Sequence, residues 1–537
     1  MEKLKLADSY DVPPAAEYRH AVPASAPASS DARANTAGAV GRWLLLFLLA
    51  GHLIWRREFA HQSLGSLLTL AHWNAPAVLS QAYITEICLL AMLPLALLIW
   101  RRGHQRATVP PGQGALAKGF GPALYLCIAM LAWAGGHLVA GFIRQPHDSY
   151  LVLRQSALGG YALVFLYAYL FFGDQSKHVR QAAWFCVLTA VVCAALDTAG
   201  LLRPDPSIPT YYPGEPLYGQ QTLPLGILAL GLLVVCSDQK WPLRVLALLL
   251  AGFIGWRQSQ RVLQSSVILG MAGALALYVV MGAVLAWRGQ SNTFKRALLL
   301  LGLFGFGACV YGTYRHINKG DSIATEAASE MHAWSPSSYS SLMALYEETK
   351  VPDDSTKWVQ SRRPPYDLVT DPEVYKLNAV YMKARTSGGV SLVNNIWRGL
   401  VWRRMFQDWR DGCRWQGAGV GKAWFYPGMY QSPFHYGEDR EGLEPHNSLL
   451  NYLYRYGAVG IGLLILLVIV VFWFVFKALN STLTGEPLLE GIVLFFFYSA
   501  LFACFNVALE GPSYAMPFWV ALGVMYGKAR QGNQSRV

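Results

Sequence analysis

Long runs of hydrophobic residues, separated by short polar segments, repeat along most of this 537-residue chain. A transmembrane helix needs about 20 mostly apolar residues, because the hydrocarbon layer is about 30 Å thick and a helix rises about 1.5 Å per residue. Twelve runs reach or approach this length, so the pattern predicts an all-α, polytopic membrane protein with about twelve transmembrane helices. The runs lie at residues 42–56, 80–100, 119–143, 155–173, 180–201, 219–237, 241–256, 262–287, 295–313, 449–476, 486–508 and 513–528.

The polar segments divide the chain into five regions. Residues 1–40 are rich in Ala, Pro and Ser, and we expect a disordered cytoplasmic tail because such a composition buries too little apolar surface to offset the entropy of ordering. Nine spans follow in 41–313, and three more occupy 449–528. Between them, 314–448 forms one large outer segment that we expect to be mostly helical, and 529–537 is a second cytoplasmic tail.

Composition agrees with this pattern, since 54% of the residues are hydrophobic and only 14% are charged, against about 25% charged in soluble domains. The net charge of +12 raises the question of a nucleic-acid partner. However, the segment from Arg315 to Pro445 holds 16 basic and 16 acidic residues, so the whole excess lies in the tails and short loops. We interpret the charge as membrane topology and expect no nucleic-acid partner.

Basic residues in short loops place both termini in the cytoplasm and the segment 314–448 in the periplasm. The cytoplasmic residues are Arg101, Arg102, Arg106, Lys118, Lys177, Arg180, Lys240, Arg244, Arg288, Lys295, Arg296, Lys528, Arg530 and Arg536. Seven arginines fall on the opposite side, where topology gives no reason for cations, so we expect some of them to bind an anion. They are Arg56, Arg57, Arg144, Arg154, Arg203, Arg257 and Arg261.

Three features of the outer segment suggest a site. Residues 396–410 predict a helix that ends at Asp411-Gly412, with Trp397, Leu400, Val401 and Phe406 near one face. The Gly417-Ala-Gly-Val-Gly421 stretch predicts a turn packed tightly against another element, because glycine permits positive φ and close backbone approach. His446-Asn447 precedes an apolar run, and Asn447 is suited to cap that helix. Taken singly, His446 is an ordinary interfacial residue.

Together these features resemble the O-antigen ligase and Wzy-type polymerase superfamily of membrane glycosyltransferases. The resemblance covers about residues 240–530. Family members carry an Arg next to a Ser at the start of a span, whereas here Gln260 separates Ser259 from Arg261, which leaves open whether Arg257 or Arg261 is the equivalent. Residues 316–390 carry no motif and resemble an insertion. The matching elements are Arg398-x-x-x-Trp402, Gly417-x-Gly419-x-Gly421, and His446-Asn447 before a span with Gly457 and Gly460.

The resemblance implies transfer of a glycan from undecaprenyl pyrophosphate to a sugar hydroxyl, with inversion and without metal or cofactor. Arg261 and Arg398, with Arg257, would bind the diphosphate, because a guanidinium matches phosphate oxygens and stays charged. His446 would accept the proton of the attacking hydroxyl. Further residues expected to line the substrate site are Asn447, Trp402, Gly417, Gly419, Gly421 and Glu510.

Several functions remain open at this stage. The leading expectation is a ligase of the bacterial inner membrane that joins the glycan to lipid A-core oligosaccharide on the periplasmic face, surrounded by membrane lipids. A Wzy-type polymerase and a protein O-oligosaccharyltransferase use the same donor with other acceptors. A transporter or flippase is the alternative without covalent chemistry, but such proteins often place charges near the mid-membrane and contain internal repeats. The arginines of this sequence cluster at the predicted outer rim instead.

Overall fold

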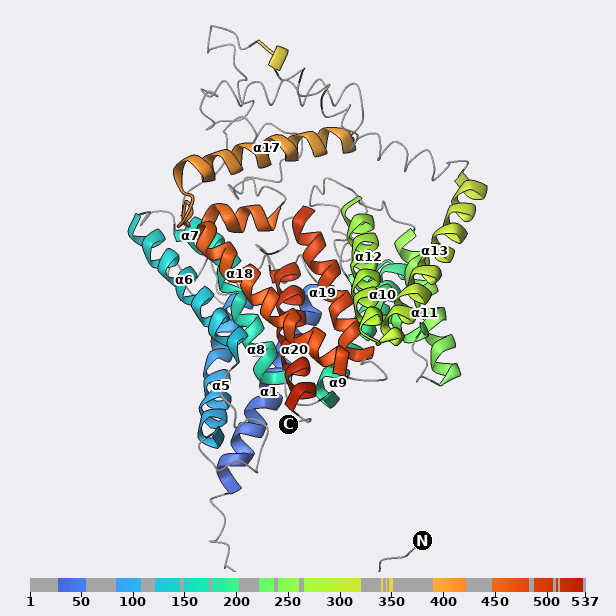
Figure 1. The fold of residues 1–537 in the computed structure, drawn as a ribbon, viewed down its shortest axis with the longest axis horizontal. Coiled ribbons are helices and arrows are strands. Elements are labelled where there is room, and N and C mark those ends of the chain that lie inside the picture. Colours follow the sequence, from blue (N-terminus) through green and yellow to red (C-terminus); the bar gives the residue numbers. More distant parts are fainter. Residues whose placement is uncertain are drawn as a thin grey trace, which may run out of the picture.

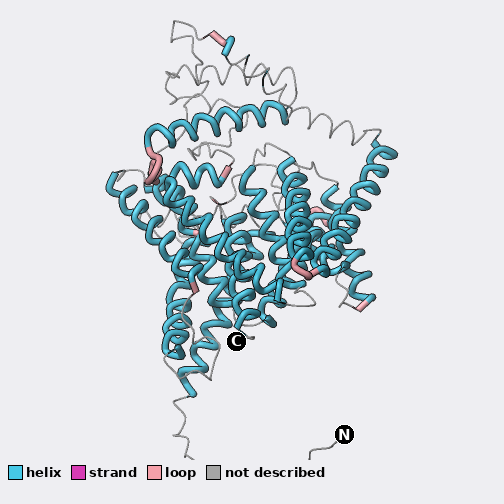
Figure 2. Tube along the Cα trace, viewed as in Figure 1, coloured by secondary structure: helices cyan, strands magenta, loops and turns pink. Residues whose placement is uncertain are grey.

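All regular structure in the described residues is helical, as Figure 2 shows. The computed structural model describes residues 28–54, 84–107, 121–144, 149–172, 176–201, 222–235, 240–259, 265–319, 340, 344, 347–350, 390–421, 447–481, 487–505, 509 and 512–534. Its helices are α1 (Ala28–Ile54), α5 (Ile84–Ala107), α6 (Pro122–Arg144), α7 (Ser149–Gly160), α8 (Ala162–Phe172), α9 (Ser176–Thr198), α10 (Thr222–Val235), α11 (Trp241–Ser259), α12 (Ser265–Trp287), α13 (Ser291–Lys319), α17 (Val390–Gly412), α18 (Ser448–Ser481), α19 (Pro487–Phe505) and α20 (Pro512–Gln534).

Long apolar helices indicate a protein embedded in a membrane. Within the described residues, seven helical segments are long and apolar enough to cross a bilayer, and two shorter apolar helices accompany them. The expected all-helical class is therefore confirmed, while the count of twelve spans stays a prediction. The seven segments are Pro122–Arg144, Gln155–Phe172, Lys177–Thr198, Val267–Trp287, Ser291–Val310, Ser448–Asn480 and Pro487–Phe505.

Two helix boundaries differ from the sequence expectation. Helix α1 begins at Ala28 and so includes residues 28–40, whose composition predicts part of the disordered tail. The Ala-rich sequence there explains the difference, since alanine has the highest helix propensity. The run 155–173 is divided at Tyr161 into α7 and α8, although the Tyr161 N–H still bonds to Ala157 O at 2.9 Å.

The helices form one bundle with a helix across its end (Figure 1). Helices α18, α19 and α20 occupy the middle, with α6 to α8 on one side and α10 to α13 on the other. Helix α20 packs on α8, α18 and α19, and the main hydrophobic core lies around this helix, with Trp519 and Tyr526 buried within it. Helix α17 crosses over one end of the bundle, opposite the end at which α20 finishes.

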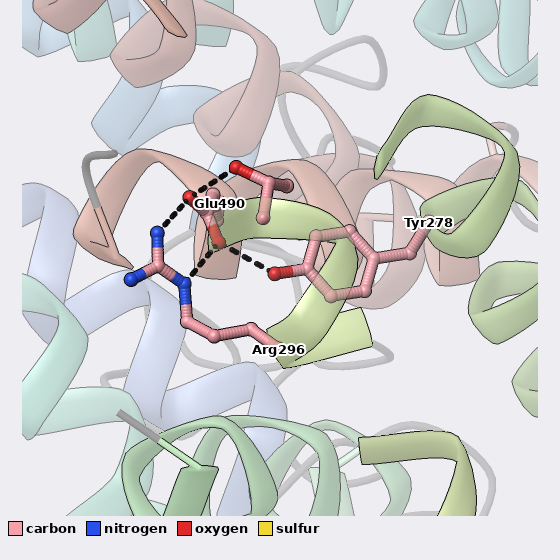
Figure 3. A network of polar contacts seen from close by, with 4 residues as sticks. Tyr278, Arg296 and Glu490 are labelled. Carbon is pink, nitrogen blue, oxygen red and sulfur yellow. Dashed lines mark hydrogen bonds and ion pairs between the residues drawn. The ribbon is translucent and has the colours of Figure 1, made fainter. Parts of the chain in front are cut away.

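A buried ion pair joins α12, α13 and α19 (Figure 3). Glu490 Oε2 accepts hydrogen bonds from Tyr278 Oη at 2.6 Å and Arg296 Nε at 2.9 Å. Its Oε1 accepts from Thr293 Oγ1 at 2.9 Å and Arg296 Nη2 at 2.6 Å. All four side chains, which we call the Glu490 cluster, are buried, so each carboxylate oxygen accepts two hydrogen bonds away from water.

The Glu490 cluster changes the interpretation of one topological charge. The positive-inside rule predicts that Arg296 belongs to a cytoplasmic loop, yet α13 begins at Ser291 and Arg296 lies buried within it. Its charge is offset by Glu490, so it adds nothing to the inside excess of positive charge. Lys295, the neighbouring residue, is exposed.

Candidate functional site

Helix α18 is broken at Gly457, close to its N-terminal end. Gly457 has φ 68° and ψ −171°, which lie outside the helical region. In an uninterrupted helix the N–H groups of Ala458 and Val459 would bond to the carbonyl oxygens of Tyr454 and Arg455, four residues earlier. The break separates these donors from their acceptors. Four backbone groups therefore need other partners, and the two carbonyl groups belong to buried residues.

Residues 413–421, which we call the glycine turn, supply all four partners. Two N–H groups of the turn bond to the released carbonyl oxygens, and two carbonyl oxygens of the turn accept from the released N–H groups. The turn thus takes the place of one missing step of the helix hydrogen-bond ladder. The bonds are Ala418 N to Tyr454 O at 2.7 Å, Gly419 N to Arg455 O at 3.0 Å, Ala458 N to Arg414 O at 3.0 Å and Val459 N to Trp415 O at 3.2 Å.

This exchange requires glycine on both sides of the contact. Gly417, Gly419 and Gly421 have φ values of 80°, 82° and 84°. A Cβ atom on Gly417 would lie 2.3 Å from Arg455 O, and one on Gly457 would lie 2.1 Å from Trp415 O. No side chain fits at such distances. The backbones of the turn and of α18 can therefore come this close only if both positions are glycine. The expected tightly packed turn is confirmed, and its packing partner is α18.

Helices α6 and α7 hold the turn from the other side. The Gly421 N–H donates to Oε1 of the buried Gln155 at 2.8 Å, and Val420 is buried. Trp133 Nε1 donates to Tyr456 O at 3.0 Å, which satisfies a third carbonyl next to the break. The turn is therefore bonded to α7 as well as to α18, and α6 is bonded to α18 beside it.

A histidine and an arginine of α6 face the middle of the turn. A methyl group added at Gly419 would lie 3.6 Å from His137 Nδ1 and 3.4 Å from Arg144 Nη1. The His137 ring packs edge-on against Trp133 and Tyr456, with ring centroids 5.0 Å and 5.3 Å away. The sequence does not predict a role for His137, because one histidine in an apolar span carries no pattern of its own.

The N-terminus of α18 is capped as the sequence predicted. The Leu450 N–H donates to Asn447 Oδ1 at 2.9 Å. Ser448 Oγ accepts from the Leu509 N–H at 2.9 Å, so the chain entering α20 is tied to the same helix end. His446, the proposed base, directly precedes this cap but lies outside the described residues.

Helix α17 carries the two other motif residues of the outer segment. The helix ends at Gly412, as expected, and packs on α18. Arg398 and Trp402 are half-buried, whereas Phe406, expected on the apolar face, is 46% exposed. At the C-terminal end, Trp409 Nε1 donates to Arg414 O at 3.0 Å and thereby joins the helix to the glycine turn.

The remaining predicted residues lie elsewhere. Arg257, at the end of α11, forms a salt bridge with the buried Asp197 of α9, and its Nη2 also donates to Asp197 O at 3.4 Å. The resemblance implies that Arg257 binds diphosphate, but some of the N–H donors of its guanidinium are already bonded to Asp197. Arg261 and Glu510 fall outside the described residues.

The geometry joins α17 and the glycine turn, which are consecutive in sequence, to the start of α18 and to α6. Helix α17, the glycine turn and the start of α18 form one hydrogen-bonded unit, with two basic side chains of α6 beside it. Within the described residues, no group of three or more His, Cys, Asp or Glu side chains is placed to hold a metal ion. Comparison of this membrane-embedded, all-helical chain with protein-family models and with curated proteins finds no match.

Proposed function

We propose that this chain is an O-antigen ligase of a bacterial inner membrane, which transfers a polysaccharide from undecaprenyl pyrophosphate to lipid A-core oligosaccharide. In this proposal the chain spans the membrane twelve times and residues 314–448 lie in the periplasm. One observation carries it. The glycine turn is bonded into the α18 break, and so connects the helix that bears Arg398 and Trp402 with the helix that Asn447 caps.

The proposed reaction is a single displacement at the anomeric carbon of the donor. The oxygen of the acceptor hydroxyl forms the new glycosidic bond as the bond to the diphosphate oxygen breaks, and the diphosphate leaves with the electron pair. The hydroxyl proton passes to His446, which is available as a base near neutral pH. Arg398 and Arg261 would offset the charge that develops on the leaving diphosphate.

A deletion strain provides the test. Its lipopolysaccharide and undecaprenyl-linked glycans are analysed by gel and mass spectrometry after complementation with wild type, His446→Ala, Arg398→Ala or Arg403→Ala. The first two variants should leave the core without polymer while long lipid-linked polymer accumulates. Arg403 lies on α17 like Arg398 but is exposed, so Arg403→Ala should restore ligation and serves as the matched control.

Other results would redirect the assignment. A core that bears a single repeat unit in the deletion strain would mean a polymerase, and unchanged lipopolysaccharide would mean another acceptor, such as a protein. Full activity of His446→Ala at wild-type membrane abundance would contradict the proposed base. That last outcome would favour a transporter, which needs no base.

A further inference from the structure

One face of α18 is uncovered from the break to the other end of the helix. The side chains of Val459, Leu466, Ile469 and Trp473 on this face are 39%, 46%, 58% and 71% exposed. Successive positions are three, four or seven residues apart, so they lie on one side of the helix. Because α18 contains a segment suited to cross a bilayer, we expect this side to contact lipid chains.

Only one end of the uncovered face carries, within α18, the residues typical of a membrane boundary. Trp473 is followed one turn later by the exposed Lys477. Tryptophan is enriched at the headgroup level, and a nearby lysine can extend to the phosphates. The structure describes every residue of α18, and the three aromatic side chains before the break, Tyr452, Tyr454 and Tyr456, are all buried. This end of α18 therefore needs an aromatic anchor from elsewhere.

The glycine turn supplies such side chains. In Figure 1 the turn descends from one end of α17 to this end of α18. Trp415 O accepts the Val459 N–H at 3.2 Å, so the turn meets α18 where the uncovered face begins. The Trp415 side chain is 71% exposed, and the neighbouring Arg414 is also exposed. Since N–H groups point toward the N-terminus of a helix, Trp415 lies beyond Val459 on the α17 side.

Helix α6 extends the lipid-facing surface beside the turn. A Cβ atom on Gly141 would lie 2.8 Å from Val420 Cγ2, so α6 and the turn are in contact. Val139 and Ile143, on either side of Gly141, are 60% and 75% exposed. Helix α6 is also suited to cross a bilayer. The turn therefore adjoins two helices whose uncovered faces contact lipid.

We propose that Trp415 and Arg414 form an interfacial anchor that binds phospholipid in the leaflet on the α17 side. The Trp415 ring lies at the headgroup level, and the Arg414 guanidinium contacts lipid phosphates, for which its planar donors are suited. The proposal depends on the membrane embedding of the chain and not on the proposed transfer reaction. Because Trp415 O is bonded within the α18 break, the anchor fixes the depth of the glycine turn in the membrane.

The dimensions of α18 agree with this placement. Trp473 lies 14 residues after Val459, so at about 1.5 Å per residue the two are separated by about 21 Å along the helix axis. Trp415 lies beyond Val459, which adds to this separation. The two exposed tryptophans are then close to the two boundaries of a hydrocarbon layer about 30 Å thick.

Depth-dependent fluorescence quenching tests the anchor. The fluorescent residue acridonylalanine replaces Trp415, Leu466 or Trp473, one at a time, in the full-length protein in phosphatidylcholine nanodiscs. Nitroxide-labelled lipids, with the label near the headgroup or near the end of the acyl chain, report the depth of each probe. Leu466 lies halfway between Val459 and Trp473, so its probe should lie near the mid-plane, and the two others about 10 Å or more from it.

Iodide in the buffer distinguishes the other surroundings of Trp415. Stronger quenching of the Trp415 and Trp473 probes by the label near the headgroup, with the reverse order at Leu466, would support the anchor. Quenching of the Trp415 probe by iodide alone would place it in water and overturn the proposal. Protection from both quenchers would also overturn it, because another part of the chain or a second copy would then cover Trp415.

An unlabelled variant gives an independent measurement. Trp415→Phe keeps an aromatic ring and the backbone bond to Val459 but removes one indole from the protein. Brominated phosphatidylcholine should therefore quench the tryptophan fluorescence of the wild type by more than that of the variant. Equal quenching of the two proteins, at equal Tm, would overturn the proposal even if the probe at Trp415 prevents folding.

Discussion

The α18 break and the Glu490 cluster solve the same problem in opposite ways. Each satisfies polar groups that are removed from water inside the bundle. At the break, backbone groups do most of this, since four backbone hydrogen bonds close the gap and Trp133 Nε1 adds one bond to Tyr456 O. In the Glu490 cluster, one carboxylate and one guanidinium do so, with two hydroxyl groups completing the set. The first arrangement depends on the absence of side chains, and the second on ionised ones.

The largest expected effect is that of Gly457→Ala. A Cβ atom there would overlap Trp415 O and force the glycine turn out of the break. Each buried backbone group left unpaired costs about 1–3 kcal/mol, so losing the four bonds would reduce the free energy of unfolding by more than about 4 kcal/mol. Thermal unfolding in detergent measures this loss. Gly462→Ala in the same helix is the control, since a Cβ at Gly462 meets no atom within 4 Å.

Glu490→Gln should be the next most severe change. The amide keeps the shape of the side chain but leaves the Arg296 charge buried without its counter-ion, which costs about 3–5 kcal/mol. The same unfolding measurement applies, with Lys295→Met as a control that removes a neighbouring exposed charge. The double variant Glu490→Leu/Arg296→Met should recover part of the loss. If the double variant is less stable than Glu490→Gln, the ion pair is not the source of the effect.

Gln155→Leu should have an intermediate effect on the free energy of unfolding, because Gln155 binds the glycine turn. It removes the acceptor of the Gly421 N–H and leaves the four bonds to α18 in place. One buried unpaired donor lowers the free energy of unfolding by about 1–3 kcal/mol. Gln290→Leu is the control, because the Gln290 amide donates to Asn480 O at an exposed position. Equal Tm values for the two variants would show that α7 does not hold the turn.

The smallest effect is expected at Asp411, next to the glycine turn. A hydrogen bond from Arg410 holds the pKa of Asp411 below its usual range, and both side chains are exposed. A lowered pKa in the folded state stabilises the protein above the ordinary Asp pKa of about 3.9, and this contribution is lost as the pH falls through the lowered value. Asp411→Asn should therefore match the wild-type Tm at neutral pH within error, because exposed pairs contribute little. A clear drop in Tm would mean that this pair helps to hold the turn.

Local features were predictable because their causes lie within a few residues. Runs of apolar residues predicted the helices, and the spacing of Gly417, Gly419 and Gly421 predicted a tight turn. The cap at Asn447 followed from its place before an apolar run. The start of α1 is harder to predict, because its composition is typical of disorder although alanine has a high helix propensity.

Sequence alone determined that the chain is helical and membrane-embedded, and where its glycine turn lies. Only the tertiary structure decided which groups meet. Arg296 and Glu490 are 194 residues apart, and Arg257 and Asp197 are 60 apart, so neither pairing leaves a signal in local periodicity. The same holds for the turn and the α18 break, and for His137 beside Gly419. The packing of whole helices determines such partners. A buried charge or backbone group needs a complementary group nearby, and only the fold brings that group close.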